Sequence, residues 1–148
     1  MFLFNKTMLI HCRCHVIGKI TAVSNAATME TSSGSIKLRR IIHLVDHTYT
    51  TTSIFAYSPL PPILNLFSFN IIIHSGNMIE LSLFGPRAQE FDGDTVYEVG
   101  RKSHVIAIFV GTSMKQYKGS PPFLSGTAAC RWYVNENDVT EIRDFYKR

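Results

Sequence analysis

The sequence predicts an all-β fold that ends in a helix. Residues 103–117 and 123–134 are long runs rich in β-branched and aromatic residues, as in strands. Residues 138–146 place Val139, Ile142 and Phe145 at helical spacing. Residues 78–84 alternate in polarity, with one face formed by Ile79, Leu81 and Leu83 and the other by Glu80, Ser82 and Phe84.

The N-terminal part supplies two more strands. Residues 15–23 are expected to form the first, with a bend or bulge at Gly18. The polar residues 24–35 are interpreted as a loop. Residues 37–46 are expected to form the second strand, which begins with basic residues and ends at Asp46, a residue favoured in turns.

The elements that follow complete the order expected of a small barrel. Residues 86–91 suit a short helical turn followed by an Asp92–Gly93 turn, and the strand over 103–117 is expected to bend at Gly111. Trp132 and Tyr133 alternate, so one ring should face the core, and Asn137 or Asp138 should cap the last helix. Together these features predict a five-stranded Greek-key OB-fold barrel with a short helix between strands 3 and 4 and a C-terminal helix. An SH3-like barrel is the nearest competitor, but it offers no place for that short helix.

The 148 residues suit one domain, which we place at residues 15–148 after an N-terminal extension of residues 1–14. An apolar insertion at about 47–75, without any charged residue, interrupts the domain where a hairpin is expected. The interpretations are a tolerated loop insertion and translation of a retained intron. A membrane span over residues 54–73 is the weaker alternative, because three prolines and several polar residues interrupt the segment, and no membrane partner is predicted.

Charge and cysteine content limit the choice of partners and compartments. The net charge is +4, and residues 1–46 hold six Lys or Arg against two acids, which suits an anionic partner. The three cysteines have no framework spacing, which favours reduced thiols inside a cell. The N-terminus lacks the features of a signal peptide.

The candidate site combines aromatic side chains with cations. Phe84 and Tyr117 fall at the ends of predicted strands, where rings could stack on unpaired bases. The other interpretation is that they are ordinary core or surface aromatics. Basic residues nearby could contact phosphates or merely form solvated charge clusters, and they are Lys37, Arg39, Arg40, Lys115 and Lys118.

Catalytic and metal sites are not expected. The chain contains no G-x-S-x-G, P-loop or H-E-x-x-H motif, and the acids Glu90, Asp92 and Asp94 suit a solvated loop. His and Cys cluster at residues 11–15, but a C-x-C spacing without a second pair is weak evidence for zinc. We therefore predict a non-enzymatic protein with no cofactor and no metal.

Several segments, taken in order, resemble the large subunit of replication protein A. The similarity covers roughly residues 15–46 and 76–148 and is strongest to the second single-stranded-DNA-binding OB domain of plant-type sequences. The segments that carry it are Val16-Ile-Gly-Lys-Ile-Thr-Ala-Val, Arg39-Arg-Ile-Ile-His-Leu-Val-Asp, Ile79-Glu-Leu-Ser-Leu-Phe-Gly, Ala88-Gln-Glu-Phe-Asp-Gly, Val105-Ile-Ala-Ile, Tyr117-Lys-Gly and Val134-Asn-Glu-Asn-Asp.

This resemblance implies roles for individual residues. Phe84 and Tyr117 match the two stacking aromatics, although the family commonly has Trp at the first position. Arg39 and Arg40 match basic residues that contact phosphates, and Lys37 is added on charge alone.

The implied function is single-stranded DNA binding in replication, repair or recombination in the nucleus, with RNA as another ligand. The family's zinc site and trimerisation helix are not found in this sequence, which leaves assembly with other replication protein A subunits open. The alternative is a protein-interaction or degenerate OB module that does not bind nucleic acid.

Overall fold

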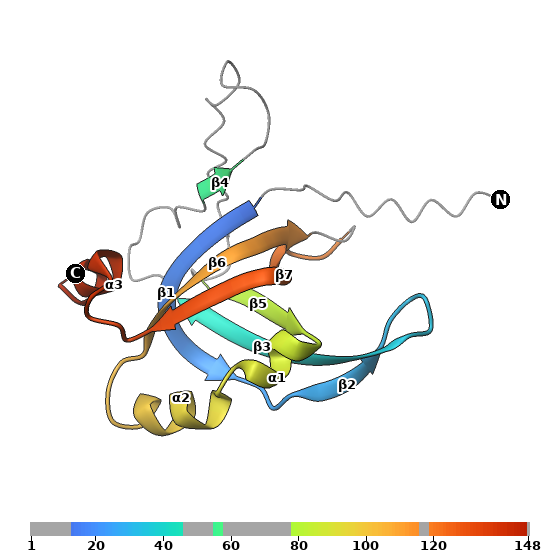
Figure 1. The fold of residues 1–148 in the computed structure, drawn as a ribbon, viewed down its shortest axis with the longest axis horizontal. Coiled ribbons are helices and arrows are strands. Elements are labelled where there is room, and N and C mark those ends of the chain that lie inside the picture. The colour runs from blue at the N-terminus through green and yellow to red at the C-terminus, as the bar shows by residue number, and fades with distance from the viewer. Residues whose placement is uncertain (1–12, 46–54, 58–77, 116–118, 148) are drawn as a thin grey trace, which may run out of the picture.

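The computed structural model describes residues 13–45, 55–57, 78–115 and 119–147 (Figure 1). In chain order the elements are β1 (Arg13–Val23), β2 (Ala27–Glu30), β3 (Ile36–Val45), β4 (Phe55–Tyr57), β5 (Met78–Phe84), α1 (Pro86–Glu90), α2 (Gly93–Gly100), β6 (Ile106–Lys115), β7 (Phe123–Val134) and α3 (Thr140–Tyr146). The predicted strands at 15–23, 37–46, 78–84, 103–117 and 123–134 are all present, with ends shifted by three residues at most.

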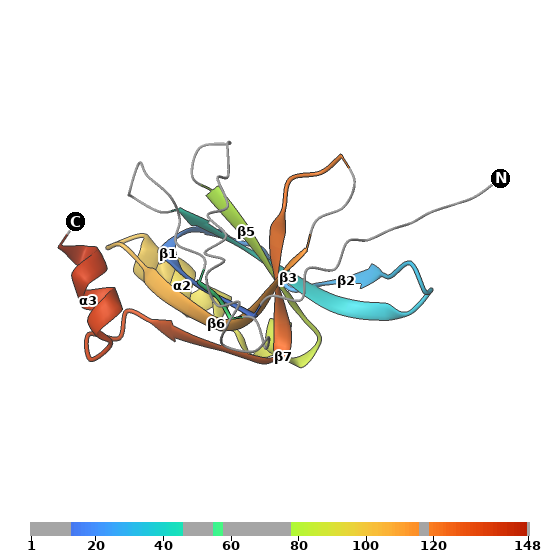
Figure 2. The same ribbon diagram turned by 90° about the horizontal axis from the view of Figure 1, so that it is seen from above.

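Five of the strands close into a barrel. β3 pairs with β1 and β5, β5 with β7, β7 with β6, and β6 with β1, so the ring of pairings returns to its start. Every pairing in this ring is antiparallel except β5 with β7. This is the connectivity of an OB-fold, and the prediction of an all-β OB barrel is confirmed. The helices α1 and α2 fall between its third and fourth strands (Figures 1 and 2).

Alternating side chains place the core inside this barrel. On β5, Ile79, Leu81 and Leu83 are at most 2% exposed, as their spacing predicts. On β3 the inward positions include Ile42 and Leu44, which are fully buried. Residues on the outer faces of β3 and β5 are thereby left to face away from the core.

The strand β6 bends where predicted. Gly111 has a φ of 77°, a left-handed conformation that favours glycine, and the register with β7 shifts between Val110 and Thr112. Before the bulge Phe109 faces the core, and after it Thr112 does. The bulge therefore turns Lys115, at the strand's end, to the outer face.

Two clusters of apolar side chains hold the fold together. In the main core the rings of Phe91, Phe109 and Trp132 lie within 5.5–6.3 Å of one another, centroid to centroid. A smaller cluster packs Ile142 and Phe145 of α3 against Ile106 on the outside of β6. Trp132 faces the core while Tyr133 is 40% exposed, which confirms the prediction that one ring points inward.

Three local predictions are wrong. The expected loop over residues 24–35 contains β2, which pairs with β3. This stretch lacks the apolar alternation typical of a strand, and pairing with β3 stabilises it instead. Asp92–Gly93 is the start of α2 and not a turn. Neither Asn137 nor Asp138 caps α3; its N-cap is Val139, whose N–H donates to the Glu136 carbonyl at 3.0 Å.

The insertion and the domain boundaries stay predictions. Of residues 47–75 only β4 is described, and it pairs with the N-terminal end of β1. β1 begins at Arg13, just inside the predicted extension of residues 1–14. In the described part of the chain, no helix has the length and apolar character needed to cross a membrane, and most of residues 54–73 falls outside that part.

The Asp92 carboxylate caps α2 and makes stability depend on pH. The hydroxyl and the backbone N–H of Thr95 donate to it at 2.6 and 3.0 Å, and these bonds lower the pKa of Asp92 below its ordinary 3.8. A lowered pKa stabilises the fold above about pH 3.8, and this contribution is lost as pH falls through the folded-state value. We expect Asp92→Ala to lower the melting temperature at pH 7.

The difference between wild type and Asp92→Ala should narrow when both proteins are melted at progressively lower pH. Because both proteins contain all the other carboxylates, the difference between their melting temperatures at each pH reports on Asp92. A gap that stays constant from pH 7 to pH 2 would contradict the assignment.

Candidate nucleic-acid interface

The outer faces of β3 and β5 form one continuous surface. The two strands are antiparallel, with Arg39 opposite Phe84 and His43 opposite Glu80. Directly opposed residues point to the same side of a sheet. Arg39, His43, Glu80 and Phe84 therefore share a face, together with Ser82, and we call this surface the β3–β5 face.

Two cations lie close to the Phe84 ring. The Arg39 guanidinium carbon and the Lys115 Nζ are each 5.9 Å from the centroid of its half-buried ring. Both distances are within the range of a cation–π contact. β3, β5 and β6 thus bring together three residues that are far apart in the sequence, and all three are candidates from sequence.

Arg39 is held by its neighbours on β5. It donates from Nε and Nη2 to Ser82 Oγ at 3.1 and 2.8 Å, and from Nη2 to Glu80 Oε1 at 3.0 Å. The other carboxylate oxygen of Glu80 lies 3.9 Å from His43 Nε2. The guanidinium is therefore fixed in place while its side chain keeps 29% exposure.

Lys37 lies on the same side of β3 as Arg39, two residues away, and is exposed. It stands opposite Met29 of β2, in the hairpin that projects from the barrel on the side away from α3 (Figures 1 and 2). The basic side chains therefore continue from the β3–β5 face onto this hairpin.

Arg40 does not join them. It lies in line with Ile42 on the inner side of β3, and its Nε donates to the Ala88 carbonyl of α1 at 2.9 Å. Its Nη1 donates to the Ser24 carbonyl at 3.1 Å. The strand alternation sends neighbouring arginines to opposite faces. Arg40 is therefore separated from the β3–β5 face and binds backbone carbonyls, and its contact with phosphate stays a prediction.

We expect Arg40→Met to lower the free energy of unfolding by about 1–3 kcal/mol, because it leaves the buried Ala88 carbonyl without its donor. Urea unfolding measures this loss. Binding of nucleic acid by the folded variant should keep its dependence on salt. A reduced salt dependence with normal stability would restore Arg40 to the interface.

Three of the predicted site residues, Arg39, Phe84 and Lys115, meet around the Phe84 ring. Two others lie outside the described residues. Those two are Tyr117 and Lys118. Sequence alternation placed Glu80 and Ser82 on the face of Phe84. It gave no sign that they bind Arg39, because the register between β3 and β5 is not visible in sequence.

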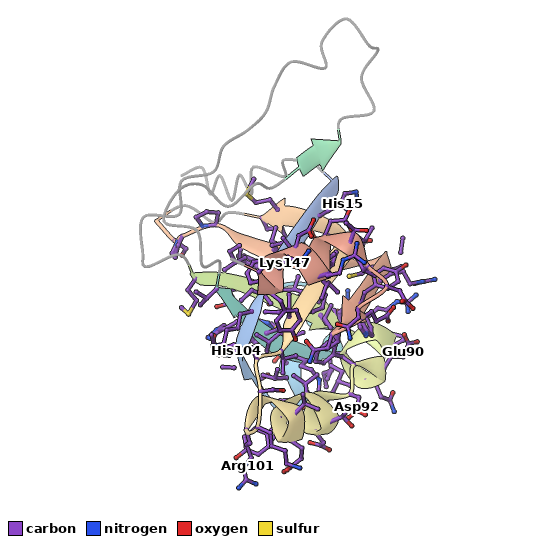
Figure 3. The ribbon with its side chains drawn as sticks, turned by 90° about the vertical axis from the view of Figure 1, so that its left-hand side faces the viewer. His15, Glu90, Asp92, Arg101, His104 and Lys147 are labelled. Carbon is purple, nitrogen blue, oxygen red and sulfur yellow. The ribbon has the colours of Figure 1, made fainter. Side chains whose placement is uncertain are left out.

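The acidic residues near the helices have structural partners. Glu90 accepts from Arg87 at 2.6 Å, and Asp92 caps α2. Figure 3 shows both on the side of the molecule that carries α1 and α2, with Arg101 at the far end of α2.

The predicted absence of a metal stays an expectation. The described residues contain no group of three His, Cys, Asp or Glu side chains suited to a metal ion. His11 and Cys12 of the weak zinc motif lie outside them. Cys130 is buried, and burial raises the pKa of its thiol to about 11.

Comparison with known proteins gives no family. No family model matches the chain, and no curated protein matches it. Among solved structures, it is similar to fission yeast Pot1 in a complex with single-stranded DNA, with 12% identity and a TM-score of 0.47. That likeness covers 99% of this chain and 43% of the Pot1 chain, so this chain spans less than half of that protein.

Proposed function

We propose that this OB barrel binds single-stranded DNA on the β3–β5 face, as a binding protein and not as an enzyme. The observation that carries the proposal is the Phe84 ring with two cations, Arg39 of β3 and Lys115 of β6, each 5.9 Å from its centroid. A ring beside cations is what binding of unpaired bases with little sequence preference requires.

Each part of the face has its own role. A base stacks on Phe84, a contact typically worth about 1–3 kcal/mol. Lys37, which is exposed, and Lys115, which is half-buried, neutralise phosphates as the strand passes from the hairpin across the face. Arg39 adds its positive charge beside the ring.

The wider role rests on the resemblance to the large subunit of replication protein A. Under this proposal the protein acts in the nucleus in replication, repair or recombination. RNA is a second ligand for the same stacking surface, and other subunits of replication protein A are candidate partners.

Fluorescence anisotropy with a labelled oligo-dT strand, repeated over a series of salt concentrations, tests the proposal. Saturable binding that weakens with salt is expected. Because each phosphate contact contributes about 0.7 to the logarithmic salt slope for a single strand, the double variant Lys37→Ala/Lys115→Ala should lose about 1.4 of it.

Lys102→Ala is the matched control, because Lys102 is exposed beyond the end of α2. It should leave the slope unchanged. Absence of saturable, salt-sensitive binding by the wild type would overturn the proposal and favour a protein-interaction or degenerate OB module. If the wild type binds, comparison of oligo-dT with oligo-U ranks DNA against RNA.

A further inference from the structure

From the geometry around Phe84 we infer that Arg39 reads the edge of the base stacked on that ring and selects guanine. The inference rests on the proposed function, since it needs a single strand on the β3–β5 face. It goes beyond that function by assigning a base preference and the residues that set it.

The first argument is that Arg39 is fixed. Three hydrogen bonds from Nε and Nη2 hold its guanidinium over Ser82 and beside Glu80. Ser82 is itself fully buried, so its hydroxyl is a rigid acceptor. A fixed, planar donor group recognises a particular acceptor geometry, whereas a long lysine follows a phosphate wherever it lies.

The second argument is position. A base stacked on Phe84 lies about 3.5–4 Å above the ring, and the guanidinium carbon is 5.9 Å from the ring centroid. The guanidinium is therefore within reach of a base that contacts this half-buried ring. The three bonds to described residues use only Nε and Nη2, which leaves the two hydrogens of Nη1 to meet the base.

Guanine best fits a donor at that point. Its O6 and N7 are adjacent acceptors, and contact of Arg with this pair is the commonest specific base contact. Adenine offers N7 next to an amino group, so a second donor there would face a donor. Thymine offers O4 as a single acceptor beside a methyl group.

Glu80 and Ser82 are positioning residues in this scheme. They contact Arg39 and not the base, and Glu80 in turn lies opposite His43 on β3. The prediction from sequence that Arg39 contacts phosphate is then replaced by base reading, and phosphate contact is left to Lys37 and Lys115.

The test compares three labelled strands of equal length: oligo-dT, alternating dT and dG, and alternating dT and dA. Alternation avoids runs of guanine, which would fold on themselves. The wild type is expected to bind the dG strand at least fivefold more tightly than the other two. Replacing each guanine by 7-deazaguanine, which lacks N7, should reduce this preference.

Arg39→Lys separates reading from charge. It should lose the guanine preference, measured as the ratio of the affinities for the dG strand and for oligo-dT, while the retained positive charge keeps the salt dependence. Glu80→Ala should also lower this ratio, because it removes one of the three hydrogen bonds that hold the guanidinium. Thermal unfolding checks that both variants are folded.

Two results would overturn the inference: equal binding of all three strands by the wild type, or a guanine preference that survives Arg39→Lys. In both cases oligo-dT binding persists and the proposed function stands. Failure of the wild type to bind any strand rejects the proposed function together with the inference.

Discussion

Replacing Phe84 with alanine is expected to weaken oligo-dT binding by roughly 1–3 kcal/mol, or about 5- to 150-fold. The substitution removes the stacking surface and leaves Arg39 of β3 and Lys115 of β6 without the ring that both contact. Because the charges stay, the salt dependence should change little. Anisotropy titrations over several salt concentrations separate the two effects.

Tyr97→Ala is the matched control for loss of an aromatic ring. Tyr97 is 65% exposed on α2, away from the β3–β5 face, so its removal should leave DNA affinity unchanged. Phe84→Trp should keep or improve affinity, because it enlarges the stacking surface. Equal affinities of Phe84→Ala and wild type, with both proteins folded, would remove Phe84 from the interface.

Tyr117, the second stacking residue predicted from sequence, can be tested in the Phe84→Ala background. If it stacks on a base, the double variant should lose roughly a further 1–3 kcal/mol. If the second substitution changes nothing, Phe84 acts without it.

The barrel could be predicted from sequence because its strands are strongly marked. Alternation over residues 78–84 specified which side chains of β5 are buried, and Gly111 marked the bulge in β6. The long runs of β6 and β7 are apolar enough for their type to be clear. These signals are local, so neighbouring residues alone reveal them.

Features that depend on a partner strand or on a cap were missed. β2 is a four-residue strand of polar character that exists because β3 lies beside it. α2 begins at an Asp-Gly pair, which is typical of turns, and the pairing of Asp92 with Thr95 makes it a helix start instead. Val96 and Val99, three residues apart, were the available sign of its buried side.

The site was predicted as a set of residue types and not as an arrangement. Sequence placed a ring at Phe84 and cations at Arg39, Arg40 and Lys115. Only the register of β3 against β5 shows that Arg39 reaches the ring and Arg40 reaches α1 instead. Because side chains alternate along a strand, these two adjacent arginines point to opposite faces of β3 and have different partners.

The largest expected effect on stability comes from Phe91→Ala. Phe91 is 1% exposed, and its ring contacts Phe109 of β6 and Trp132 of β7, so it ties the junction of α1 and α2 to the barrel. Truncation of a buried Phe typically costs about 3–5 kcal/mol, through lost burial and the cavity left behind. That is a large part of the roughly 5–15 kcal/mol that stabilises a typical domain.

Urea unfolding followed by tryptophan fluorescence measures this loss, because Trp132 is the single tryptophan and lies 5.5 Å from the Phe91 ring, centroid to centroid. Tyr97→Ala, an exposed ring on the neighbouring helix, should leave the midpoint nearly unchanged. Phe91→Leu should fall between the two, since it keeps most of the buried volume. The same midpoint for Phe91→Ala and Tyr97→Ala would mean that the three-ring cluster does not hold the helices to the barrel, and that α1 is held chiefly by the bond from Arg40 to Ala88.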